Sequence, residues 1–138
     1  PLLFSDKKRM KTPDDRKYIK DHDWVKIGPD GLAIFGITDY AQDSLGDVVF
    51  VELPNSGSEI SQSTSFGEIE SVKAVSELIA PVSGTVTDRN DAVVDTPELV
   101  NTSPYENGWL LKVKMSDASE IEGLMTADEY ESFLANEV

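Results

Sequence analysis

Short apolar or alternating runs cover the chain, and clusters of turn residues separate them. Asp23–Lys26 and Leu32–Ile37 flank the turn Gly28–Gly31, an arrangement that predicts a β-hairpin. Residues 47–53 form an almost continuous apolar run, which is typical of a buried strand. The segment 109–115 alternates with a period of two, so we expect one face to carry Trp109, Leu111, Val113 and Met115 and the other Leu110, Lys112 and Lys114.

Two stretches carry helical signals. The first is predicted to start at a Thr38 or Asp39 cap and to end at Gly46. Near the C-terminus, Thr126 and Glu129 have the spacing of a capping box, after which Tyr130, Phe133 and Leu134 share one helical face. The pattern as a whole predicts a mainly β fold, a small barrel or sandwich with short helices and a C-terminal helix.

The composition excludes several kinds of chemistry. The 138 residues include no cysteine and one histidine, His22, so disulfides, thiolate zinc sites and histidine-only metal sites are ruled out, and we expect no metal. Formal net charge is −14, and seven of the twelve lysines and arginines lie within residues 1–20. The acidic remainder of the chain argues against a nucleic-acid partner, because phosphate backbones repel it.

The length suits one domain, which we place at residues 10–138. Residues 1–9 precede Met10 and lack the apolar core of a signal peptide, so we expect a leader or an artificial extension there. No apolar run approaches the roughly 18 residues of a membrane-spanning helix, and no membrane partner is expected.

No catalytic arrangement is recognisable in the sequence. His22 has no nucleophile motif near it, and no glycine-rich phosphate loop leads from a strand into a helix. The acidic residues are too numerous for a catalytic pair to be singled out. We therefore expect a protein without catalytic residues.

Lys73 stands apart from the other lysines because it is the only one between residues 27 and 111. Residues prone to form β-strands precede it in Phe66–Ser71 and follow it in Ala74–Ile79. This pattern predicts a tight hairpin with Lys73 at or near its tip. On these facts alone, Lys73 is either an ordinary surface lysine or an attachment point.

A family resemblance favours the attachment point. Blocks of the sequence resemble the glycine cleavage system H protein family in order, over about residues 18–133. These blocks are Glu70–Ala74 (Glu-Ser-Val-Lys-Ala), His22–Val25, Gly36–Gln42, Leu45–Pro54, Pro81–Gly84, and Asn101 with Ser103–Trp109.

The resemblance implies a lipoyl carrier with the barrel-sandwich hybrid fold of lipoyl and biotinyl domains. Lys73 would bear lipoic acid in amide linkage. Glu70 lies three residues before it and Gly84 eleven after it, the frame that lipoate-attaching enzymes read in such domains. We also expect Gly84 to be a turn glycine that uses a positive φ angle.

The family resemblance also implies partners. A decarboxylase that depends on pyridoxal phosphate (PLP) passes the aminomethyl group of glycine to the carrier, and an aminomethyltransferase removes it. Dihydrolipoamide dehydrogenase reoxidises the arm with flavin and NAD. The carrier would be a non-catalytic monomer in the bacterial cytoplasm or the mitochondrial matrix.

Two departures from the family pattern concern the cleft that receives the arm. Asp23 stands where the family usually has glutamate, and Ser44 stands where some members have histidine. We expect Asp23 and Glu77 to shelter the loaded arm through partly exposed contacts, the alternative being that both are solvated acids. Side chains expected to serve packing or hydrogen bonding are His22, Trp24, Tyr40 and Trp109.

Two other functions compete with the glycine cleavage carrier. A related lipoyl protein could relay lipoate to another complex, and an interaction domain could keep the scaffold without the modification. The presence of Lys73 together with Glu70 and Gly84 speaks against the unmodified domain.

Overall fold

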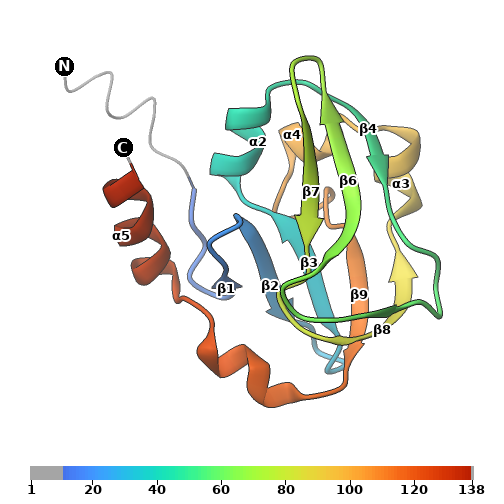
Figure 1. Ribbon diagram of the computed structural model, residues 1–138, viewed down its shortest axis with the longest axis vertical. Coiled ribbons are helices and arrows are strands. Elements are labelled where there is room, and N and C mark those ends of the chain that lie inside the picture. Colours follow the sequence, from blue (N-terminus) through green and yellow to red (C-terminus); the bar gives the residue numbers. More distant parts are fainter. Residues whose placement is uncertain (1–10, 138) are drawn as a thin grey trace.

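The computed structural model describes residues 11–137, and in this range the chain forms two antiparallel sheets (Figure 1). The six-stranded sheet has the order β1 (Lys17–Tyr18), β2 (Asp23–Ile27), β3 (Ala33–Ile37), β9 (Leu111–Met115), β8 (Gly84–Arg89), β5 (Glu59–Ile60). The three-stranded sheet has the order β4 (Val48–Glu52), β6 (Ser65–Ser71), β7 (Val75–Ile79). The expected leader or extension, residues 1–9, lies outside the described residues.

One hydrophobic core fills the space between the two sheets. Val51, Ile69 and Leu78 come from the small sheet, and Phe35 and Val113 from the large one, and all five are almost fully buried. Burying each such side chain contributes about 1.5–3 kcal/mol. The mainly β architecture with short helices and a C-terminal helix confirms the expected fold class and is consistent with a barrel-sandwich hybrid.

The first hairpin and the first helix form where the local sequence signals predicted them. β2 and β3 pair in antiparallel register across the Gly28–Gly31 turn. Helix α2 (Asp39–Leu45) begins after Thr38, whose hydroxyl accepts a 3.1 Å hydrogen bond from the backbone N–H of Ala41. It ends at Gly46, whose φ of 80° only glycine adopts readily.

The C-terminal helix α5 (Ala127–Glu137) starts with the expected capping box. The backbone N–H of Thr126 donates to the Glu129 carboxylate at 2.9 Å, and the Glu129 N–H donates to the Thr126 hydroxyl at 3.2 Å. Tyr130 then stacks on Tyr18 with ring centroids 4.8 Å apart, within a second cluster of aromatic side chains that includes Trp24. A 3₁₀ helix, η1 (Ala118–Gly123), leads into α5. Within residues 11–137, no helix has the length and apolar character of a membrane span.

Two strand interpretations were partly wrong. In β4 only Val48 and Val51 are buried, because a bulge between Val48 and Phe50 turns both Val49 and Phe50 outward, 51% and 48% exposed. Leu110 precedes β9 and lies in the core, with its N–H donating to the Phe35 carbonyl at 2.7 Å. The alternation therefore begins only at Leu111.

The sequence interpretation also missed the short helices α3 (Asp91–Asp95) and α4 (Leu99–Thr102). Each buries one valine, Val93 in α3 and Val100 in α4. Helices of one turn present too few residues for a periodic pattern, which explains why they were not predicted.

Candidate functional site

Lys73 lies at the tip of the β6–β7 hairpin, as predicted, at the top of the molecule in Figure 1. Val72 and Lys73 form the exposed loop between Ser71 and Ala74. The Ser71 N–H donates to the Ala74 carbonyl at 2.8 Å. In return, the Ser71 hydroxyl accepts from the N–H groups of Ala74 and Lys73 at 3.1 and 3.3 Å. Ser71 is itself buried, so its hydroxyl holds the loop from the inside of the protein.

A second set of hydrogen bonds ties the hairpin to the start of β4. The Val72 N–H donates to the Asp47 carbonyl at 3.1 Å. Asn101 then holds both neighbours of Asp47, because its amide donates to the Gly46 carbonyl at 2.9 Å and its oxygen accepts from the Val48 N–H at 2.9 Å. The Lys73 backbone is therefore held from two sides, while its side chain remains exposed.

Sequence reasoning missed Ser71 and Asn101 as supporting residues. Ser71 had a local signal, because a serine beside a tight turn often hydrogen-bonds the backbone two or three residues later. Asn101 had no local signal, because its partners Gly46 and Val48 lie more than fifty residues earlier in the chain.

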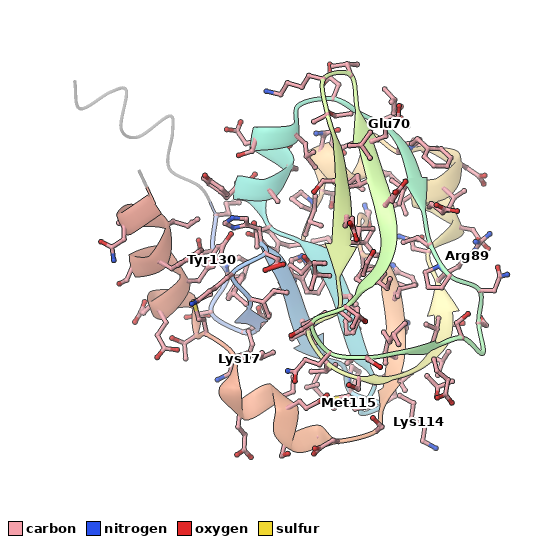
Figure 2. The ribbon with its side chains drawn as sticks, viewed as in Figure 1. Lys17, Glu70, Arg89, Lys114, Met115 and Tyr130 are labelled. Atoms are coloured by element: carbon pink, nitrogen blue, oxygen red, sulfur yellow. The ribbon has the colours of Figure 1, made fainter. Side chains whose placement is uncertain are left out.

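The Lys73 side chain emerges beside the end of α2. A Cβ atom added at Gly46 would lie 3.5 Å from Cε of Lys73. Glu70, three residues before Lys73, is exposed on β6 near the same end of the sheet (Figure 2). Its register partners are Phe50 on β4 and Val75 on β7. Glu70 and Lys73 therefore belong to one surface.

Gly84 lies at the opposite end of the molecule. It begins β8 and pairs with Met115, which Figure 2 places far from Glu70. The expected positive φ is wrong: the glycines with positive φ in the described chain are Gly31, Gly46 and Gly57. The reason for glycine here is close packing, because an added Cβ would lie 2.2 Å from the Lys114 carbonyl oxygen.

Asp23 is buried, which corrects the expectation of a partly exposed contact. Only 1% of the residue is exposed, and Oδ2 has no hydrogen-bond partner among the described residues. Burial raises the pKa of this carboxyl well above its usual value, and the charge of nearby Asp21 raises it further. A backbone hydrogen bond from Ile79 opposes the shift in pKa.

Glu77 is exposed on β7 and faces an open groove of about 620 Å³. The groove lies between β7 and the turn after β1, and is lined by Lys20, Asp21, Val75, Ser76, Glu77 and Ile79. A second cavity, of about 470 Å³, shares Lys20, Asp21 and Ile79 and extends toward Met125. The two cavities share Lys20, Asp21 and Ile79 in their walls, and we call them together the depression along β7. The backbone of Ile79 also hydrogen-bonds the Asp23 carboxyl.

Residues expected to serve packing or hydrogen bonding do so. The Nδ1 atom of His22 lies 2.8 Å from the Tyr130 hydroxyl, and the His22 ring packs against Tyr40. Trp24 is buried and donates to the Pro104 carbonyl at 3.1 Å. Trp109 packs in the second aromatic cluster.

Comparison with known proteins identifies the family. The model of the glycine cleavage H-protein family matches residues 16–137. The chain belongs to this family. A glycine cleavage system H protein from Staphylococcus carnosus is 52% identical over 125 residues, covering 91% of this chain and 98% of that protein. One from Bacillus velezensis is 55% identical over 122 residues, covering 88% and 95%.

A solved structure supports the same assignment. The crystal structure of a glycine cleavage system H protein from Mycobacterium marinum superposes with a TM-score of 0.83 at 44% identity, covering 89% of this chain and 98% of that one. Membership of the H-protein family supports a role as a lipoyl carrier component of the glycine cleavage system.

Proposed function

We propose that Lys73 carries lipoic acid in amide linkage and that the chain moves the aminomethyl group of glycine from the PLP-dependent decarboxylase to the aminomethyltransferase. Dihydrolipoamide dehydrogenase and a lipoate-attaching enzyme complete the set of partners. The observation that carries the proposal is an exposed lysine on a hairpin whose backbone is held by Ser71 and Asp47. The bacterial relatives favour the bacterial cytoplasm.

The residues around Lys73 fit a covalently attached arm. The exposed amine leaves room for an acyl group, and four flexible methylenes separate it from the anchored backbone. The attached dithiolane would supply the sulfur that accepts the aminomethyl group, and the protein supplies its position. Because this chain has no cysteine, none of its own side chains can exchange with the dithiolane.

The recognition residues act in different ways in this proposal. Glu70 is exposed near the hairpin tip and is available for direct contact with the attaching enzyme. Gly84 is remote from the tip, and it acts only through the stability of the fold, because a side chain there would strike the Lys114 carbonyl and separate β8 from β9.

The depression along β7 is the proposed resting place of the loaded arm. Glu77 is open to it, and its carboxylate is suited to the cationic amine of the cargo. Asp23 is buried and hydrogen-bonded to the Ile79 backbone, so its direct contact with the cargo requires a local opening. An exposed pair at Glu77 contributes about 0.2–1 kcal/mol.

Reconstitution with glycine decarboxylase tests the function. Glycine decarboxylation is measured with the lipoylated parent, with Lys73→Arg, and with Lys114→Arg as a matched control, because the Lys114 side chain is exposed at the other end of the molecule. We expect activity with the parent and the control, and none with Lys73→Arg, because a guanidinium cannot form the amide. Activity with Lys73→Arg would overturn the assignment. A lipoylated parent that the decarboxylase does not use would instead favour the lipoate-relay function.

A further inference from the structure

The outer face of the β4–β6–β7 sheet carries an unusual arrangement of exposed side chains. The register places Phe50, Glu70 and Val75 side by side on the three strands. The adjacent row holds Glu52, Glu68 and Glu77. All six side chains are exposed, and we call these two rows the glutamate face.

The three glutamates of this second row repel one another. Glu68 lies directly opposite Glu52 on one side and Glu77 on the other, and like charges in such cross-strand positions destabilise a sheet. Within residues 11–137, none of these three forms an ion pair. Charges on the edge strands β4 and β7 also prevent edge-to-edge pairing, but Glu68 is on the central strand, where that reason does not apply.

Apolar side chains adjoin the glutamates at the Lys73 end. Phe50 is 48% exposed and Val75 63% exposed, and Val72 at the tip is 71% exposed. The bulge in β4 adds Val49 to the same end of the strand. Glu70 lies between Phe50 and Val75, so exposed apolar and acidic side chains alternate on this surface beside Lys73, and a partner can bind it through both kinds of contact.

We propose that the glutamate face docks the lipoate-attaching enzyme, through an apolar recess for Phe50 surrounded by lysine or arginine side chains. The inference rests on the proposed function of Lys73. The new amide bond forms at Nζ, so that enzyme must bring its catalytic centre to the hairpin tip before any arm exists. The other partners act on the sulfur atoms at the far end of the arm, so the attaching enzyme is the partner whose catalytic centre must reach Nζ itself.

The chemical step is the transfer of an activated acyl group. Nζ attacks the carbonyl carbon of lipoyl-adenylate, the C–N bond forms, the bond from carbon to the phosphate oxygen breaks, and AMP leaves as the nitrogen loses its proton. The glutamate face takes no part in these bonds. It orients the hairpin and neutralises the enzyme's cationic rim, which raises the association rate.

The test measures lipoylation of purified unmodified protein by a lipoate ligase with lipoate and ATP. Initial rates from intact mass give KM and kcat separately. The test variants are Phe50→Ala and the double variant Glu52→Gln with Glu68→Gln. The matched controls are Ile27→Ala, which is 43% exposed in the parent at the end of β2, and the double variant Glu122→Gln with Glu131→Gln, exposed on η1 and α5.

We expect KM to rise about tenfold for Phe50→Ala, the effect of losing a central apolar anchor, with kcat nearly unchanged. The Glu52/Glu68 double variant should raise KM and flatten its dependence on salt, while the thermal midpoint rises because repulsion is removed. Both controls should keep the parent KM. A rise in stability together with weaker docking separates an interaction role from a structural one.

The two hypotheses fail in distinguishable ways. If Lys73 of the parent is modified and both glutamate-face variants keep the parent KM, the docking surface is wrong and the proposed function stands. If Lys73 of the parent is not modified by the ligase, the proposed function itself fails. An equal rise in KM for the control variants would also overturn the docking surface, because the effect would then not be local to the glutamate face.

Discussion

Replacing Gly84 with alanine separates a packing role for this glycine from direct recognition. The added methyl would lie 2.2 Å from the Lys114 carbonyl oxygen and 2.7 Å from Cγ1 of Val113, both on β9. Strand β8 must therefore move, which stretches the pairing of Gly84 with Met115. Overpacking costs about 1–3 kcal/mol and a weakened backbone hydrogen bond about 1 kcal/mol, so we expect a loss of about 2–4 kcal/mol in the free energy of unfolding.

The assay is urea unfolding followed by the fluorescence of Trp24 and Trp109. Gly123→Ala is the matched control, because its added methyl meets nothing within 4 Å, and it should change stability by less than about 0.5 kcal/mol. Lipoylation of Lys73 is then measured at a temperature where the Gly84→Ala variant remains folded, and should proceed close to the parent rate. Parent-like stability with abolished lipoylation would refute the packing argument and show that Gly84 is read directly.

Four further predictions follow from other parts of the structure. Asp23→Asn should be more stable than the parent at pH 7, measured by urea unfolding. The difference should shrink toward pH 4, because the folded parent retains its proton above the usual pKa of 3.8 and loses stability as pH rises through the raised pKa. Asn101→Ala should cost about 1–3 kcal/mol by the same measurement, because it unpairs the Val48 N–H and the Gly46 carbonyl. The rate of association with the decarboxylase, measured by stopped flow, should fall as salt rises, because the chain has a net charge of −14. An association rate that does not change with salt would exclude electrostatic steering. Glu77→Gln should shorten the lifetime of the loaded arm after the decarboxylase is removed; an unchanged lifetime there and in the double variant with Asp23→Asn would show that neither acid shelters it.

The features that could be predicted from the sequence are those whose causes are local. Thr38 and Thr126 cap the helices that begin immediately after them. The hairpin around Lys73 follows from β-prone residues on both sides of a short loop. Its assignment as an attachment site needed the family resemblance, because an exposed lysine has no distinguishing chemistry of its own.

The features that the sequence did not reveal depend on contacts between distant segments. The requirement for glycine at position 84 comes from the Lys114 carbonyl, thirty residues later. The burial of Asp23 depends on β7, which contributes Ile79. Phe50 looked like a core residue within an apolar run, and only the bulge against β6 turns it outward. Each of these depends on register, which short-range patterns do not specify.

Mass spectrometry with peptide mapping shows directly which lysine carries the lipoyl group. The parent and Lys73→Arg are incubated with lipoate ligase, lipoate and ATP, and Lys112→Arg serves as the control. We expect one lipoyl group on the peptide that contains Lys73 in the parent and the control, and no lipoyl group on folded Lys73→Arg. A lipoyl group on any other lysine, or none on the parent, would contradict this expectation.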